Sequence, residues 1–457
     1  MLHQIASTYM SSGSLEQAET FYQRILAENP DDIVATKALI TLHERLGRPE
    51  SLLKNFERLT ELEPGNFDAH NQLGRLLQQR GRFDDARRYF RQALKLNPER
   101  TDLYVELATI TKYSEYSDEI ALMEKRFESV DLNRDRQREI AFALGKIFDD
   151  LREYDKAFKY YSAGNQIADE DYSSSAKGMP ADSIPAMVEF NQKIKKVFGI
   201  DFFRRFDAAG IDDSSIIIVT GQARSGTTLV ESILDSHSLV HGTGEAEVLS
   251  PTLNSLFTDS ALTFPDGSGD LPVESIRKSA LSYVRAVKGK LQDFSHFVDK
   301  SLGMDAKFGL FFIMLPNAKI IHCDRDPLDQ GLSYYFRDFG VQHPFCYDLQ
   351  TIGWRHRLYQ DLITHWDEAM PGRIYHLQYE NVISDTENEV RKLLEFCGLG
   401  YESACLRFYE TKRVVRTASL AQVRQPINDS SVGRWKNYQE HLEPLMQALE
   451  APFPESQ

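Results

Sequence analysis

The stretch SIIIVTGQARSGTTLVESILDS, residues 215–236, sets the architecture of the second half of the chain. It opens with a short β-branched run suited to a buried parallel strand and closes with the spacing of an amphipathic helix. Between them, Gly221 and Gly226 bracket a Gly-x-x-x-x-Gly loop. Such a loop turns backbone amides toward an anion, and the following helix adds its positive N-terminus. We therefore predict a phosphate-binding loop between a strand and a helix.

The side chains of this loop distinguish it from the P-loop of a nucleotide triphosphatase. Thr227 stands where such a loop carries its phosphate-binding lysine. Arg224 supplies a cation that can bind an anion in bidentate fashion. The candidates for holding a 5′-phosphate or phosphosulfate are Arg224, Ser225, Gly226, Thr227 and Thr228. A kinase or NTPase is the alternative, and it would need the missing lysine and an acidic residue that binds magnesium.

The residues on either side of the loop alternate between strand and helix patterns. AKIIHC (318–323) has the pattern of a second strand, and RIYHLQ (373–378) is a weaker third candidate. Helical patterns cover 226–235, 273–292, 303–314, 349–369 and 384–397. The alternation predicts a three-layer α/β domain with a parallel sheet over residues 213–457. Ligands of such domains bind at the carboxyl ends of the strands.

The first hundred residues repeat with a period of 34. Three sets of residues keep this spacing: Gly13, Gly47 and Gly81; Pro30, Pro64 and Pro98; and the aromatics Tyr22, Phe56 and Phe90. This is the period of the tetratricopeptide repeat, a helix–turn–helix unit that buries its faces by stacking on its neighbours. The clearest unit covers residues 67–100, and a divergent unit fills 101–134. A further unit follows around Gly145, Ala157 and Tyr161.

We expect an all-α repeat array over residues 1–170 and boundary helices over 171–212. The array is either a passive stalk or oligomerisation surface, such as that of a homodimer, or a concave face that binds a peptide or protein partner. The sequence leaves these alternatives open.

Composition and charge exclude several classes of protein. A net charge of −15 argues against a protein that coats nucleic acid. No apolar run approaches the roughly 20 residues that span a bilayer, and the first residues do not read as a signal peptide. Cys397 and Cys405 could pair in an oxidising compartment, but we expect reduced core cysteines. His237 and His241 have no metal-ligand partners at suitable spacing, so we expect no metal and a cytoplasmic protein.

A second block, CDRDPLDQGLSYYFRDF (323–339), carries further anion-binding side chains. Arg325 ends a predicted strand, and Ser333 lies eight residues later. On a helix that runs from Pro327, Ser333 and Arg337 share a face. We therefore expect Arg325, Ser333 and Arg337 to converge on one phosphate group.

With these blocks, most of residues 215–440 resemble the sulfotransferases that use 3′-phosphoadenosine-5′-phosphosulfate (PAPS). The similarity is strongest to the tyrosylprotein sulfotransferases and to bacterial sulfotransferases fused to tetratricopeptide repeats. The resemblance implies that PAPS is the co-substrate and that no metal is required. It implies that Arg325, Ser333 and Arg337 bind the 3′-phosphate and that Tyr379 packs beside the donor.

A third block, SLAQVRQPINDSSVGRW (419–435), resembles the loop that wraps the nucleotide in this family. The donor-binding residues that the resemblance implies here are Gln422, Val423, Pro426, Asn428 and Arg434. Arg434 takes the place of a family lysine, which preserves the charge but changes the geometry.

Sulfuryl transfer needs a base for the acceptor hydroxyl and positive charge where negative charge develops. In HGTGEAEVLS (241–250), the resemblance places the base at Glu245, with Glu247 as the neighbouring alternative. In FVDKSLG (297–303) it places a charge-stabilising lysine at Lys300, although the following Ser301-Leu302 departs from the family pattern. Arg224 and Ser419 complete the expected catalytic set. His237, His241 and His322 also invite a role as base, but we expect structural roles for His237 at a helix end and His322 within a strand.

These patterns predict a PAPS-dependent sulfotransferase that moves a sulfuryl group to an acceptor hydroxyl. The acceptor is either a protein tyrosine or a carbohydrate or small molecule, and the sequence does not choose between them. A repeat scaffold with an inactive transferase domain is an alternative of another class. This alternative is disfavoured because the chain keeps all six residues expected for activity: Arg224, Glu245, Lys300, Arg325, Ser333 and Arg337.

Overall fold

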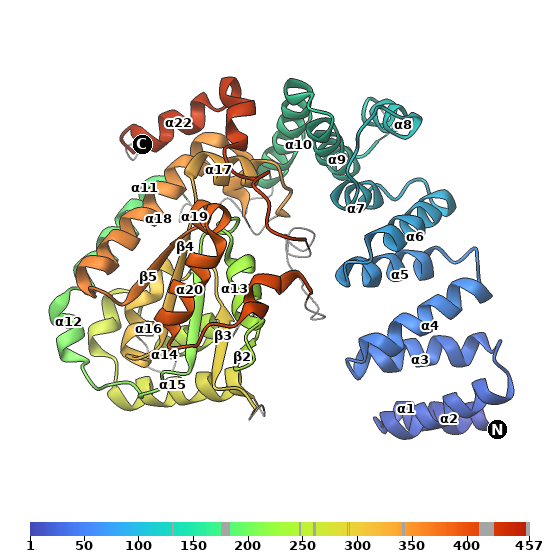
Figure 1. Ribbon diagram of the computed structural model, residues 1–457, viewed down its shortest axis with the longest axis horizontal. Helices are drawn as coiled ribbons and strands as arrows, with labels where there is room; N and C mark the ends of the chain where they lie inside the picture. Colours follow the sequence, from blue (N-terminus) through green and yellow to red (C-terminus); the bar gives the residue numbers. More distant parts are fainter. Residues whose placement is uncertain are drawn as a thin grey trace. The chain divides into compact units, whose positions relative to one another are not determined.

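The computed structural model describes residues 1–129, 132–174, 183–245, 248–258, 262–289, 291, 293–340, 343–410 and 425–453. The chain divides into two compact units, and the division falls between Leu151 and Arg152 (Figure 1). In the described part of the chain, no helix is long and apolar enough to cross a membrane.

The first unit consists of helices arranged as consecutive hairpins. Its helices are α1 (Leu2–Ser11), α2 (Leu15–Glu28), α3 (Ile33–Arg45), α4 (Pro49–Leu62), α5 (Phe67–Gln79), α6 (Phe83–Leu96), α7 (Asp102–Ile110), α8 (Asp118–Phe127) and α9 (Arg134–Asp150). The periodic glycines Gly13, Gly47 and Gly81 lie in the turns inside the first three hairpins, where their φ angles of 78°, 61° and 74° favour glycine. The periodic aromatics Tyr22, Phe56 and Phe90 are buried. The 34-residue period therefore arises because each hairpin repeats a glycine in its turn and an aromatic residue in its core.

The second unit is built on a five-stranded parallel sheet with the strand order β2-β3-β1-β4-β5. The strands are β1 (Ile216–Gly221), β2 (Val240–Gly242), β3 (His296–Lys300), β4 (Lys319–Asp324) and β5 (Ile374–Gln378). Every residue of the central β1 is buried, and successive side chains of a strand point to opposite faces, so both faces of the sheet are covered. Val219 pairs with Lys300 and Gly221 pairs with Cys323, so the loops that follow these strands start at one edge of the sheet.

Helices and short 3-10 segments surround this sheet (Figure 1). The helices are α10 (Tyr154–Ser174), α11 (Ile184–Val197), α12 (Ile200–Arg205), α13 (Thr227–Asp235), α14 (Leu249–Thr258), α15 (Val273–Lys288), α16 (Phe308–Met314), α17 (Pro327–Tyr335), α18 (Leu349–Ala369), α19 (Tyr379–Ser384), α20 (Thr386–Cys397) and α22 (Glu443–Glu450). The 3-10 segments are η2 (Asp266–Asp270), η3 (Asp305–Lys307), η5 (Pro344–Tyr347), η6 (Ser403–Glu410) and η7 (Arg434–His441). The largest core cluster joins Ile216 and Ile218 of β1 to aromatic residues that include Tyr283, Phe311 and Trp366.

Several expected elements differ in detail from the structure. The helix expected over 303–314 is divided into η3 and α16, and the helix expected over 273–292 ends at Lys288. The helix that starts at Pro327 ends at Tyr335, so Arg337 lies just beyond it and not on its face with Ser333; this expectation was wrong. The short β2 was not expected as a strand. Its three residues are too few to give a periodic signal.

Helix α10 has the sequence pattern of the last repeat but packs within the second unit. The side-chain amide of Asn165 donates to the Tyr335 carbonyl at 2.7 Å, and the ring of Tyr161 stacks on Phe336 at 3.9 Å between centroids. The α10 helix therefore contacts the end of α17, the helix that carries Ser333. The domain limits expected at residues 170 and 212 stay predictions.

Candidate functional site

The predicted phosphate-binding loop has a backbone conformation that favours glycine at Gly226. Gly226 has a φ of 92°, and a Cβ atom at this position would lie 2.6 Å from Cδ2 of Tyr379. Arg224 has a φ of 67°, a left-handed conformation that a residue other than glycine adopts only when its surroundings hold it there. The loop is therefore closely packed against Tyr379, the residue that the sequence placed beside the donor.

The remaining loop residues are held by the turn and by the start of α13. The Ser225 hydroxyl donates to the Gln222 carbonyl at 2.7 Å. Thr227 and Thr228 are the first two residues of α13, and both are buried. The amides of this helix start lie next to the loop, as anion binding at a helix N-terminus requires.

Arg224 lies among other cations. Its Nε donates to the Ser333 hydroxyl at 2.8 Å, so the loop and α17 are in direct contact. Burial is the largest cause that lowers the pKa of Arg224, and the charges of Arg337 and Arg325 lower it further. Two further guanidinium charges that act on Arg224 favour an anion close to it. The structure thus brings Arg224, Arg325, Ser333 and Arg337 into one cluster.

Arg325 ties this cluster to the segment before η7. Its Nη1 donates to the Arg224 carbonyl at 3.0 Å, and its Nη2 donates to the Ser431 carbonyl at 2.6 Å. The guanidinium stacks 4.8 Å from the centroid of the Tyr379 ring. Arg325 is 8% exposed, and its buried Nε has no hydrogen-bond partner among the described residues. A buried donor of this kind calls for a ligand or water.

Asp329 is a functional candidate that the sequence analysis missed. It is 2% exposed and accepts hydrogen bonds from the backbone of Gly433 at 2.5 Å and of Trp435 at 2.8 Å. These two amides flank Arg434, whose guanidinium lies 5.2 Å from the centroid of the Phe336 ring. Asp329 therefore fixes the backbone on both sides of Arg434. The sequence did offer one indication of this role: Asp329 lies four residues before Ser333, which places both on the same face of α17.

Lys300 and Glu245 form the second half of the site. Lys300 ends β3, is 1% exposed, and places its ammonium 3.0 Å from Oε1 of Glu245. The same ammonium lies 3.7 Å from Glu231 and 3.4 Å from the Thr228 hydroxyl. A buried ammonium is tolerated here because carboxylates compensate its charge. The Glu245 side chain is 46% exposed, so its carboxylate can reach an incoming molecule.

Two buried acidic residues hold the catalytic candidates in place. Glu231 of α13 accepts from the Gly244 amide at 2.9 Å and so fixes the turn that carries Glu245. Asp299 accepts from the Tyr283 hydroxyl at 2.6 Å and from the Ser301 hydroxyl at 3.0 Å. Ser301, which departs from the family pattern, thus stabilises the strand end beside Lys300. Glu231 was missed, although an acidic residue inside the apolar run LVESIL was a visible signal.

Other predicted site residues lie elsewhere or outside the described residues. Pro426 and Asn428 are exposed, and Asn428 accepts from the Ser430 amide at 3.2 Å. The predicted residues Ser419, Gln422 and Val423, and the alternative base Glu247, lie outside the described residues.

The histidines have structural partners. Nε2 of the buried His237 donates to the Gly400 carbonyl at 2.9 Å, and its Nδ1 accepts from the Leu239 amide at 3.1 Å. His322 contacts His376 at 3.0 Å, and burial lowers its pKa to about 3. His241 packs against the ring of Phe294. Within the described ranges, no group of His, Cys, Asp and Glu side chains is arranged to hold a metal.

Parts of both units are similar to known protein families. Residues 216–403 match the sulfotransferase family, and residues 1–32 and 67–100 match tetratricopeptide repeats. The predicted fold class is confirmed: a helical repeat array precedes an α/β domain with a parallel sheet, and this domain contains the match to the sulfotransferase family.

Individual proteins and solved structures are similar to this chain at low sequence identity. An uncharacterized protein of Aquifex aeolicus is 29% identical over 455 residues, which cover 96% of this chain and 57% of the relative. The chain thus spans a little more than half the length of that protein. The sulfotransferase domain of the Synechococcus PCC 7002 olefin synthase is 19% identical, over 50% of this chain and 88% of its own, with a TM-score of 0.37. A sulfotransferase from Alicyclobacillus acidocaldarius is 16% identical, over 53% and 96%, with a TM-score of 0.30.

Proposed function

We propose that the second unit transfers a sulfuryl group from PAPS to an acceptor hydroxyl. The observation that carries this proposal is the arginine cluster, in which the buried Nε of Arg325 has no partner among the described residues. A 3′-phosphate would satisfy this donor and offset the repulsion between Arg224, Arg325 and Arg337. PAPS carries such a phosphate, whereas ATP does not.

The donor would be held at two places. The loop from Arg224 to Thr228 would bind the 5′-phosphosulfate through amides, hydroxyls and the helix N-terminus. The cluster of Arg325, Ser333 and Arg337, with Arg434 fixed by Asp329, would bind the 3′-phosphate. The donor itself supplies the sulfuryl group and the leaving group, adenosine 3′,5′-bisphosphate.

The chemistry then falls to Glu245 and Lys300. Glu245 accepts the proton of the acceptor hydroxyl as its oxygen bonds to sulfur. The bond between sulfur and the oxygen of the 5′-phosphate breaks, and the products are a sulfate ester and the bisphosphate. Lys300 and Arg224 stabilise the negative charge that develops on the transferring group and the leaving oxygen.

The test is a calorimetric titration of adenosine 3′,5′-bisphosphate, ADP and ATP in the absence of magnesium. We expect selective binding of the bisphosphate, because only this nucleotide carries a phosphate on the 3′ position. Preference for ATP, or no binding of any nucleotide, would overturn the proposal and favour a kinase-like or scaffold function.

The choice of base has its own test. We expect Glu245→Gln to abolish sulfuryl transfer from labelled PAPS while bisphosphate affinity is retained. Glu247→Gln is the matched control and is expected to remain active. If Glu247→Gln is inactive and Glu245→Gln is active, the base is assigned to the wrong carboxylate.

The first unit supports a role in protein interaction, because tetratricopeptide repeats stack into concave binding surfaces. We propose a polypeptide partner for this face, and light scattering on the purified chain tests the homodimer that the sequence leaves open. A cytoplasmic location is part of the proposal. The described cysteines, Cys397 and Cys405 among them, are free and buried, as expected in a reducing compartment.

A further inference from the structure

Lys300 and Glu245 pair with each other, although the proposed transfer needs both side chains at the reacting atoms. The Lys300 ammonium lies 3.0 Å from Oε1 of Glu245. Glu245 would take up the proton of the acceptor hydroxyl, and a protonated carboxyl group carries no charge. Lys300 is 1% exposed, and a buried ammonium is costly when no opposite charge compensates it. Another negative group is therefore needed beside Lys300 during the transfer.

Glu231 of α13 lies where it can provide this charge. Its Oε2 is 3.7 Å from the Lys300 ammonium, and its Oε1 accepts from the Gly244 amide at 2.9 Å. The distance of 3.7 Å is longer than a hydrogen bond, so Glu231 compensates the charge without engaging an N–H group of Lys300. The N–H groups of Lys300 can then turn to the oxygen of the leaving group as Glu245 becomes protonated.

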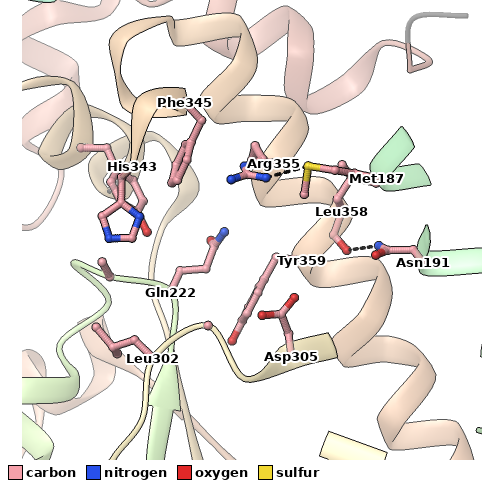
Figure 2. Close-up of a pocket in the computed structure, with 13 residues that line it drawn as sticks. Met187, Asn191, Gln222, Leu302, Asp305, His343, Phe345, Arg355, Leu358 and Tyr359 are labelled. Carbon is pink, nitrogen blue, oxygen red and sulfur yellow. Dashed lines mark hydrogen bonds between the residues drawn. The ribbon is translucent and has the colours of Figure 1, made fainter. Parts of the chain in front are cut away.

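Glu231 is not placed to act as the base itself. Its side chain is 7% exposed, whereas that of Glu245 is 46% exposed. A cavity of about 320 Å³ beside the loop offers space for a small molecule (Figure 2). Among the described residues, its wall includes Gln222 of the loop and Leu302, two residues after Lys300, but not Glu231. The wall also contains Met187, Tyr334, Phe345, Arg355 and Tyr359.

Asp299, the buried acid next to Lys300 in the sequence, is not placed to compensate it. Successive side chains of a strand point to opposite faces, so Asp299 points away from Lys300. Its carboxylate accepts from the Tyr283 hydroxyl at 2.6 Å and from the Ser301 hydroxyl at 3.0 Å. Burial also raises the pKa of Asp299, which disfavours its charged form. Of these acids, Glu231 is the one that can stay charged beside Lys300 when Glu245 accepts the proton.

We propose that Glu231 is a positioning residue that keeps Lys300 charged and in place while Glu245 takes up the proton of the acceptor. This inference rests on the proposed function. Glu231 acts on the reaction in two ways, through its charge on Lys300 and through its contact with the Gly244 amide, next to the base. The charge is the part that matters for transfer, because it releases Glu245 from the task of compensating Lys300.

The test is Glu231→Gln in the full chain, which keeps the shape and an oxygen that can accept from the Gly244 amide but removes the charge. Turnover is measured with sulfur-labelled PAPS. The probe acceptors are phenol and a tyrosine-containing peptide, and water is an acceptor in every assay. We expect kcat to fall about 100-fold, as for the loss of one preorganised electrostatic contact. The KM for PAPS and the affinity for adenosine 3′,5′-bisphosphate should change less than about threefold, because the contact supports the transition state and not donor binding.

The Lys300→Met background separates the charge of Glu231 from its role in the turn. In this background the ammonium is gone, so Glu231→Gln should lower kcat no further. A role that is only structural, through the Gly244 turn, would lower kcat by the same factor in both backgrounds. That result would overturn the inference.

Two further variants complete the comparison. Glu231→Asp keeps the charge and should recover part of the kcat that Glu231→Gln loses. Asp213→Asn is the matched control, since Asp213 pairs with Lys288 at 2.7 Å just before the start of β1, at the end of that strand away from the loop. We expect this variant to have the kcat of the wild type.

The inference is overturned if Glu231→Gln keeps the kcat of the wild type, or if Glu231→Asp is no more active than Glu231→Gln. Binding of adenosine 3′,5′-bisphosphate to each preparation shows that the variant is folded. It also separates the two proposals. If the wild type binds the bisphosphate and turns over PAPS but Glu231→Gln is equally active, the role of Glu231 alone fails. If the wild type does not bind the bisphosphate, the proposed function fails as well.

Discussion

The proposed donor end of the site and the cavity beside it differ in the way the chain builds them. The donor end consists of continuous segments: the loop after β1, the segment 325–337 around α17, and the turn 431–435. The cavity is lined by residues from as far apart as Met187 and Tyr359, on helices and loops that share no motif. The first is dominated by cations and backbone amides, the second by rings. Recognition of an anion is thus compact in the sequence, whereas an apolar cavity arises from packing between distant segments.

The largest effect should follow from Lys300→Met, which removes the buried positive charge beside Glu245. We expect turnover to fall about 10³-fold, since the loss of one preorganised charge costs about 3–4 kcal/mol of transition-state stabilisation. Bisphosphate affinity should change little. Lys392→Met, which removes a surface lysine paired with Glu389, is the control. Turnover close to that of the wild type would show that Lys300 acts only as a structural charge.

Arg325→Ala tests the donor end alone. We expect the affinity for adenosine 3′,5′-bisphosphate to fall about 100-fold, because a buried charge-assisted contact is worth about 2–5 kcal/mol. The affinity for ADP, which has no 3′-phosphate, should fall less. Calorimetry with both nucleotides measures the difference, and Arg391→Ala on the surface of α20 is the control. An equal loss for both nucleotides would contradict the assignment to the 3′-phosphate.

Asp305 tests the cavity end through pH. Burial raises its folded-state pKa to about 6, so the unfolded chain ionises at lower pH than the folded one. Its contribution to stability is present below about pH 4 and is lost as pH rises to about 6, by about 3 kcal/mol. Urea unfolding followed by tryptophan fluorescence measures this, because Trp354, Trp366 and Trp435 all lie in the second unit. Asp305→Asn should remove this part of the slope, and an unchanged slope would show that Asp305 ionises normally.

The smallest effect should follow from Asp329→Asn, which keeps the shape but leaves one acceptor oxygen for two backbone amides. We expect bisphosphate affinity to fall about tenfold, because loss of one hydrogen bond to a charged group is worth about 1.5–3 kcal/mol. The turnover at saturating PAPS should stay near that of the wild type. A loss of turnover with unchanged donor affinity would mean that Asp329 does not act through Arg434.

Much of the donor end could be predicted from the sequence. The strand–loop–helix pattern predicted a loop that carries Arg224 and Gly226, and the structure has this loop between β1 and α13. In the structure, Arg224 contacts Ser333 and Arg325 of the second block, while the binding roles of these residues stay predictions. The helical face assigned to Arg337 was wrong because α17 ends two residues earlier, at Tyr335. The helix ends where Phe336 stacks on Tyr161 of α10, a contact across more than 170 residues that no local pattern records.

The sequence alone determined the repeat array and the loop between β1 and α13, because a 34-residue period and a glycine-bracketed loop are local features with a direct geometric meaning. It did not reveal Asp329, Glu231 or the cavity beside the loop. Asp329 acquires its role through amides 104 and 106 positions away, and Arg355 lines a cavity whose other walls come from distant segments of the second unit. Burial of apolar surface has no preferred direction or sequence spacing, so its outcome is settled when the segments pack together.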